Sequence, residues 1–254
     1  MDAAIRELPL HATGFLILFA RVGAVLMLLP VFSEEAVPGR IRLLIAFAMT
    51  AGMWGLLDHN VLPAARDEAG LAGTIVVELA IGLALGMVVK IMFFAIVMAG
   101  SIASLQIGLS SAIIYDASIG GQTPVLAKLV AVGAAVLCMG VGLHHLWISA
   151  IVRSYELFPV GAVPIAGDMA ALGIATVSRS MALAVSLSAP LLVYGIVFNV
   201  ALGFSSRLAP SIQVFFIAQP LNLLLGFALF ATVIGTTLAA FTGAMTDWMQ
   251  GGWS

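Results

Sequence analysis

The chain has 254 residues, of which 62% are hydrophobic and only 9% are charged, and its formal net charge is −2. Soluble domains carry about 25% charged residues, because much of any folded surface must face water. The composition therefore excludes an ordinary soluble domain and predicts an integral membrane protein. The absence of a basic tract argues against nucleic-acid binding.

Six apolar blocks follow one another, at residues 12–32, 41–57, 71–103, 124–152, 169–204 and 212–245. No alternating strand pattern competes, so the sequence predicts an all-α membrane fold. About 20 helical residues cross a bilayer, so block 41–57 is short and three other blocks are too long for one straight crossing. Pro190 and Pro220 lie inside two long blocks and predict a kink or a break in each. We expect seven or eight kinked helices and hairpins.

The first block follows Arg6 and has some features of a signal peptide. Arg21 interrupts its apolar stretch and the residues after it form a poor cleavage site, so we expect the block to be retained as a mature helix. Basic residues are divided almost evenly between alternate joints, which gives no positive-inside signal. This pattern suggests that neighbouring protein, rather than lipid alone, holds much of the chain.

Arg21, Glu78, Lys90 and Arg179 lie within apolar blocks. An unpaired charge in hydrocarbon costs about 3 kcal/mol on insertion scales, so each needs a partner, a wet cavity or an interfacial position. Glu78 and Lys90 are roughly 18 Å apart along a helix and cannot pair there. The favoured interpretation is a structural salt bridge between Arg21 and Glu78. A proton or ion pathway and snorkelling are the alternatives.

Small residues recur at intervals of four in the third block. Gly82 and Gly86 form one such set, and Gly100, Ser104 and Gly108 form another. Small residues at this spacing let helix backbones approach closely in a membrane. We expect these faces to pack on other helices of the chain or on partner subunits.

The joint after the third block, residues 104–123, is unusual because its only charge is Asp116. Ordinary loops are exposed and polar. Non-helical backbone at membrane depth is tolerated only inside protein or along a cavity, so we expect a buried or pore-facing loop. Gly120 and Gly121 would supply flexibility or positive φ angles. The alternative is a mildly apolar surface loop.

Two helix boundaries can be placed from side-chain chemistry. Thr123 is predicted as a helix N-cap, with Pro124 at the first helical position. In "SSRLAPS" the hydroxyls and Arg207 suit a helix C-terminus, and Pro210 cannot continue that helix. This short joint therefore predicts a helical hairpin with Arg207 at its tip.

Motifs of enzymes and metal sites are missing. There is no GxSxG, Walker A or GxGxxG pattern, and His144 and His145 have no accompanying ligand motif. We predict no catalytic residue, no cofactor and no metal. The alternative function is an ion-coupled secondary transporter that uses Glu78, Lys90 and Asp116 near the midplane, although no convincing internal repeat supports it. An intramembrane enzyme is a third possibility without a motif.

The segment "LGFSSRLAPSIQVFFIAQPLNLLLG" resembles the most characteristic part of the FliR family, the flagellar type III export-gate proteins with virulence-secretion counterparts. The matching positions are Leu202, Gly203, Arg207, Pro210, Val214, Phe215 and Pro220. Ser211 and Gln213 depart from the usual Gln and Asn, and Ala117 follows Asp116 where the family often has proline. Further segments, among them "FARVGAVLMLLPVFS", "VPGRIRLLIA", "ELAIGLALG" and "GLHHLWISAIVRSYELFPVG", extend the resemblance in order over nearly the whole chain.

The resemblance implies a non-enzymatic subunit of the flagellar protein export gate, in the bacterial inner membrane at the flagellar basal body. Its partners would be FliP-like and FliQ-like subunits, FlhB-like and FlhA-like proteins, and unfolded secreted flagellar proteins as substrates. Residues 1–166 would form a FliP-like region and residues 167–254 a FliQ-like hairpin.

The family's channel plug corresponds here to the loop 106–122. The resemblance assigns to this plug Gly108, Ser110, Ser111, Ile113, Ile114, Tyr115, Asp116, Gly120 and Gly121. It assigns to a cytoplasmic hairpin tip Arg207, Pro210 and Gln213. Whether the parent system is flagellar or a virulence injectisome is left open, with a lean toward flagellar.

Overall fold

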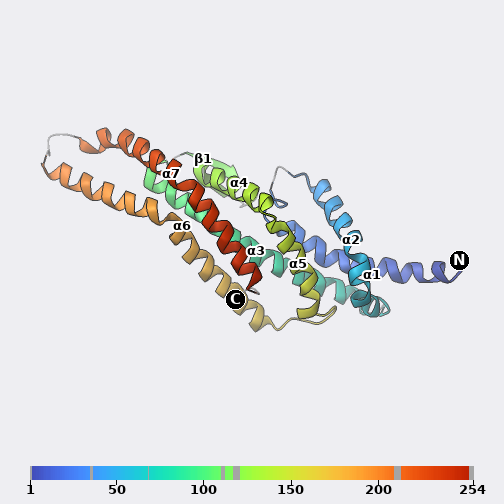
Figure 1. Cartoon of the computed structure of the whole chain (residues 1–254). Helices are drawn as coiled ribbons and strands as arrows, with labels where there is room; N and C mark the ends of the chain where they lie inside the picture. Colours follow the sequence, from blue (N-terminus) through green and yellow to red (C-terminus); the bar gives the residue numbers. More distant parts are fainter. Residues whose placement is uncertain are drawn as a thin grey trace. The chain divides into compact units, whose positions relative to one another are not determined.

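The computed structural model describes residues 2–34, 37–67, 69–109, 112–116, 121–208 and 213–251 (Figure 1). Its helices are α1 (Asp2–Leu28), α2 (Gly39–Ala65), α3 (Leu71–Ile107), α4 (Val125–Gly140), α5 (Leu143–Leu157), α6 (Ala166–Leu208) and α7 (Val214–Gln250). Two short strands, β1 (Ile113–Asp116) and β2 (Gly121–Pro124), lie between α3 and α4. The predicted all-α membrane class is confirmed, and the described residues form seven helices, within the expected number.

Five helices in the described part of the chain are long and apolar enough to span a bilayer, namely α1, α2, α3, α6 and α7. The pair α4 and α5 would add a sixth span if it crosses as one broken unit. Block 41–57 proves to be the middle of a 27-residue helix, α2, because the residues on both sides of it are also helical. These findings support a multi-pass membrane protein.

Several predicted helix boundaries are wrong in detail. Pro190 and Pro220, where a kink or a break was expected, lie inside the continuous helices α6 and α7, so neither proline breaks its helix, and the kinks stay a prediction. The apolar block 124–152 instead divides into α4 and α5 at Gly142, whose φ of +81° ends the helical path without a proline. Thr123 is not an N-cap: it pairs in β2, and Pro124, with φ −57° typical of its ring, takes the N-cap position without a side-chain bond.

The chain divides into two compact units. The first holds the described residues within 2–91 and 144–176, and the second holds those within 92–143 and 177–251. Each unit combines two separate stretches of the chain, whereas the predicted FliP-like region 1–166 and FliQ-like region 167–254 are each continuous. The similarity of these two regions to FliP and FliQ stays a prediction.

In the first unit, α1 packs against α2 through aromatic side chains. Phe15 lies 5.1 Å from Phe47 and 5.9 Å from Trp54, measured between ring centroids. Gly14 lets α1 approach the Trp54 ring, because a Cβ added there would lie 3.1 Å from it. Ile17, Leu18 and Val22 of α1 are fully buried as well.

In the second unit, the end of α3 packs against α4, α6 and α7. Val97, Ala127 and Ala131 form a buried apolar cluster between α3 and α4. Phe93 of α3 meets Phe241 of α7 edge to face, with ring centroids 5.6 Å apart. Figure 1 shows α7 running back along the later part of α6, which agrees with the predicted hairpin.

Candidate functional site

Two polar networks lie within these apolar helices, one in each unit. In the first unit, Arg21 of α1 meets Glu78 of α3, and both side chains are fully buried. Arg21 donates from Nε to Glu78 Oε2 at 2.6 Å and from Nη2 to Oε1 at 2.9 Å. This is the two-point geometry in which a guanidinium binds a carboxylate most strongly. The structure thus brings together the inter-helix pair that the sequence favoured.

The remaining donors of Arg21 reach the end of α5. Nη1 donates to the Ser154 carbonyl at 3.1 Å and to its hydroxyl at 3.3 Å, and Nη2 donates to the Phe158 carbonyl at 2.9 Å. The Tyr155 ring covers the guanidinium, 3.9 Å from Cζ to the ring centroid, a cation–π contact. A guanidinium has five N–H donors, and every one of them has an acceptor here.

Both carboxylate oxygens of Glu78 also accept hydrogen bonds. Besides Arg21, its Oε1 accepts from the backbone N–H of Gly161 at 3.3 Å. A buried ion pair with all its hydrogen bonds made holds three helices together but offers no free group to carry a proton. The geometry therefore favours the structural salt bridge over the ion pathway, and it removes Glu78 from the group of midplane charges that the transporter alternative needs.

The other two intramembrane charges lie apart from this cluster in the sequence and differ in exposure. Lys90 lies half-buried on α3, and Arg179 lies exposed on α6. The expectation that each of these two cations has a partner, a wet cavity or an interfacial position stays a prediction.

The first set of small residues brings α3 against α1. A Cβ added to Gly82 would lie 2.6 Å from the carbonyl oxygen of Arg21. One added to Gly86 would lie 2.8 Å from the Leu28 Cβ. This close approach places Glu78, one turn before Gly82 on α3, within reach of Arg21. The small residues and the salt bridge are therefore one packing arrangement within this chain.

The second set packs α3 against α4 and ends the helix. A Cβ on Gly100 would lie 2.7 Å from the Ala127 Cα, and Ser104 is fully buried. Gly108 has φ +85°, a conformation that favours glycine. Its N–H donates to the Leu105 carbonyl at 3.2 Å while the N–H of Leu109 donates to the Ser104 carbonyl at 2.9 Å. These paired bonds form a Schellman motif, which ends α3 and sets where the loop begins.

The predicted plug loop contains an antiparallel hairpin. Strand pairing joins Ile113 to Pro124 and Asp116 to Gly121, and the Val125 N–H donates to the Ala112 carbonyl at 3.0 Å at its base. Ile113 is 47% exposed. Ser110, Ser111 and Gly120 lie outside the described residues, and for Ile114, Tyr115 and Asp116 the pairing places the backbone alone. The expected non-helical loop is present, and its role stays a prediction.

The second polar network lies where this loop leaves α3. Asn222 of α7 donates from Nδ2 to the Gln106 carbonyl at 3.2 Å. Tyr194 of α6 donates from its hydroxyl to Asn222 Oδ1 at 2.8 Å, and the same hydroxyl lies 3.1 Å from the Asn222 carbonyl. These residues were not predicted from the sequence. An amide and a phenol inside apolar blocks could have indicated them, but neutral groups stand out less than charges do.

The predicted hairpin tip is described only at its two ends. Arg207 lies exposed in the last turn of α6, and Gln213 is the N-cap residue of α7 without a side-chain capping bond. Pro210 lies outside the described residues. A cation in the last turn of a helix interacts favourably with the helix dipole.

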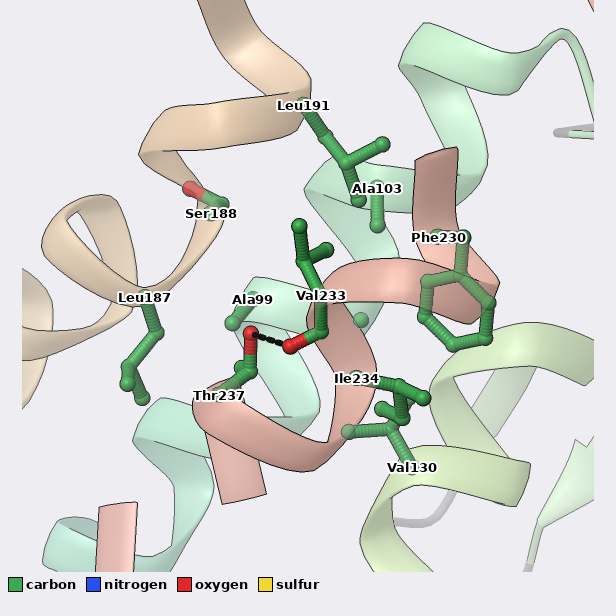
Figure 2. Close-up of a pocket in the computed structure, with 11 residues that line it drawn as sticks. Ala99, Ala103, Val130, Leu187, Ser188, Leu191, Phe230, Val233, Ile234 and Thr237 are labelled. Carbon is green, nitrogen blue, oxygen red and sulfur yellow. Dashed lines mark hydrogen bonds between the residues drawn. The ribbon is translucent and has the colours of Figure 1, made fainter. Parts of the chain in front are cut away.

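A small cavity opens between α3, α4, α6 and α7 in the second unit. Figure 2 shows apolar side chains around it, with Val130, Phe230 and Ile234 among them. Its polar groups, Ser188 and Thr237, donate to carbonyls of their own helices, the latter to Val233 at 3.0 Å. The described lining residues carry no charge, so this cavity offers no counter-ion for a charged solute.

Comparison with known proteins gives consistent matches along the chain. Residues 12–248 match the model of the family described as "Bacterial export proteins, family 1". The flagellar biosynthetic protein FliR of Caulobacter vibrioides is 40% identical over 216 residues, which cover 85% of this chain and 86% of that protein. The protein of that name from Escherichia coli K12 is 32% identical over 84% of this chain and 81% of its own length, and that of Bacillus subtilis 29% identical over 84% and 83%.

Proposed function

This chain belongs to the family of bacterial export proteins, family 1, and on that premise we propose that it is a non-enzymatic subunit of the flagellar type III protein export gate. The observation that carries the proposal is the similarity to flagellar biosynthetic proteins named FliR, which extends over 85% of the chain at 40% identity. The apolar helices support a place in a membrane. We propose that this membrane is the bacterial inner membrane, at the flagellar basal body.

The apolar surface of the last two helices supports assembly with other subunits. In the most apolar stretch of α7, only 6% is buried within the chain. Phe204 on α6 and Phe216 and Leu224 on α7 are each at least 65% exposed. Apolar surface of this kind must be covered by lipid or by other proteins. We propose that FliP-like and FliQ-like subunits pack here, with FlhB-like and FlhA-like proteins joining the gate. Arg207 at the end of α6 would contact the neighbouring hairpin tips.

The hairpin in the central loop supports a plug. A two-stranded sheet leaves unpaired backbone groups on both outer edges. Such edges do not face lipid within the hydrocarbon region, but they are tolerated inside protein or beside water. We propose that this hairpin lies in the channel through which unfolded flagellar proteins pass and closes it at rest.

Deletion of residues 110–120 tests the plug. The full-length and deleted chains would be expressed with the FliP-like and FliQ-like subunits, and the complex would be recovered by an affinity tag to measure assembly. Influx of a small solute into cells or vesicles would then be measured. We expect the deleted chain to assemble and to raise the influx, while unchanged influx at equal assembly would remove the plug role.

Co-purification tests the gate assignment independently of the plug. A gate subunit should recover FliP-like and FliQ-like proteins from detergent extracts, whereas a secondary transporter should be stable alone and bind a small solute. Recovery of a stable monomer that binds a solute would refute the proposed function.

A further inference from the structure

The last turn of α3 is capped by a side chain from a distant helix. The Schellman motif at Gly108 occupies the carbonyls of Ser104 and Leu105. It leaves the Gln106 carbonyl, one of the orphan acceptors at a helix end. Asn222 of α7 donates to this carbonyl from Nδ2 at 3.2 Å. The end of α3 from which the hairpin departs is therefore tied to α7 by a side-chain hydrogen bond.

Asn222 is in turn held by α6. The Tyr194 hydroxyl donates to Asn222 Oδ1 at 2.8 Å, so it orients the amide with its Nδ2 toward α3. Asn222 is only 8% exposed, although its neighbours Leu221 on α7 and Val193 on α6 are 51% and 60% exposed. Tyr194 and Gln106 are half-buried. The buried amide of Asn222 is therefore satisfied by partners on α6 and α3.

Small residues shape the place where this end of α3 lies. A Cβ on Gly195 of α6 would lie 2.6 Å from Cδ of the Gln106 side chain. One on Gly226 of α7, a turn after Asn222, would lie 2.8 Å from Ile107, which is fully buried. One on Gly108 itself would lie 3.3 Å from Asn222 Nδ2. The α6–α7 hairpin thus fits closely around the base of the loop.

We propose that the hydrogen-bonded chain Tyr194–Asn222–Gln106 is a latch that fixes the base of the β1–β2 hairpin to α6 and α7. The loop leaves its resting position only when this chain breaks. This inference rests on the proposed function in that the resting position is the closed state of a channel. All three groups are neutral, so the latch opens without moving a charge through an apolar zone.

The position of the hairpin can be measured without any assumption about transport. A single thiol would be placed at the exposed Ile113 (Ile113→Cys) in a chain whose only cysteine is removed (Cys138→Ala). This chain would be co-expressed with FliP-like and FliQ-like subunits, and the rate of alkylation by a membrane-impermeant maleimide would be followed. Tyr194→Phe removes only the hydroxyl that orients Asn222, and Asn222→Ala removes the capping donor.

Tyr155→Phe is a matched control. Its hydroxyl is buried and has no hydrogen-bond partner in the described part of the chain, so its removal breaks no such bond. We expect Tyr194→Phe and Asn222→Ala to change the alkylation rate by about five-fold or more, the factor of one net hydrogen bond. Tyr155→Phe should leave the rate unchanged.

The outcomes separate the latch from the channel. A changed rate in both latch variants, with wild-type assembly, supports the latch. If solute influx rises with it, the plug is supported as well, and if influx stays at the wild-type level, the latch stands while the plug fails. Unchanged alkylation in Tyr194→Phe at full assembly overturns the latch, and that variant decides the question should Asn222→Ala fail to assemble.

Discussion

The stability of the first unit should depend strongly on Glu78. Glu78→Ala removes the acceptor of two charged hydrogen bonds from Arg21, at 2.6 and 2.9 Å, and of one from the Gly161 N–H. It leaves a fully buried guanidinium without a counter-ion. We therefore expect this single substitution to be among the most damaging in the chain.

The magnitude follows from the geometry. Two hydrogen bonds to a charged group contribute about 1.5–3 kcal/mol each, and removing one member of a buried ion pair costs about 3–5 kcal/mol. Both ranges include about 4 kcal/mol, which is the loss of unfolding free energy that we expect for Glu78→Ala. At about 2–4 °C per kcal/mol for a chain of this size, the thermal midpoint should fall by about 8–16 °C.

The assay is the fraction of tagged chain that stays detergent-soluble after membranes are heated. Glu7→Ala is the control, because Glu7 is an exposed carboxylate on α1 whose loose pair with His11, at 4.0 Å, contributes little. The double variant Arg21→Leu/Glu78→Leu should recover much of the loss, since no unpaired charge remains. The reasoning is refuted if Glu78→Ala behaves like Glu7→Ala, or if the double variant loses the sum of the two single variants.

Three further predictions concern close packing and the hairpin tip. Gly82→Val should separate α1 from α3 and cost about 1–3 kcal/mol or more, whereas Gly73→Val, on the same helix with open space around it, should not change the thermal midpoint. Gly226→Ala should lower the midpoint because its Cβ would lie 2.8 Å from Ile107, while Gly235→Ala on α7 should leave it unchanged. Arg207→Ala should reduce recovery of FliP-like and FliQ-like proteins or flagellar protein export, without altering uptake of any small molecule; normal export would remove the tip role.

Charged residues within the apolar segments predicted the site better than any other feature of the sequence. Arg21 and Glu78 could be paired in advance because an isolated charge in hydrocarbon is so costly that few arrangements remain. The other partners of Arg21 could not be found this way. Two of them are the backbone carbonyls of Ser154 and Phe158, and every residue has such a group, so the sequence holds no signal for which carbonyl a cation will meet.

Proline predicted a kink or a break, and the structure excludes only the break. Each proline removes one intrahelical hydrogen bond and crowds the preceding turn. The helices α6 and α7 nevertheless continue through Pro190 and Pro220, and membrane proteins tolerate such prolines where nearby groups satisfy the freed carbonyls. The hairpin was hard to foresee, because strands of four residues are too short to show an alternating pattern.

The two polar networks differ in what it costs to break them, and this difference indicates which one can move. Separating Arg21 from Glu78 leaves two buried charges, at about 3–5 kcal/mol for each loss of a partner. Breaking the latch at Asn222 costs about 1 kcal/mol for each neutral hydrogen bond, and an amide left buried without a partner adds to that cost. Elements that open in a working cycle are drawn from the less stable parts of a structure. We therefore expect any opening motion to begin at the base of the loop, while the helices joined by Arg21 stay packed. Hydrogen exchange would test this: faster exchange at Leu109 and Val125 than in the helix turns around Arg21 is expected, and the reverse order would contradict it.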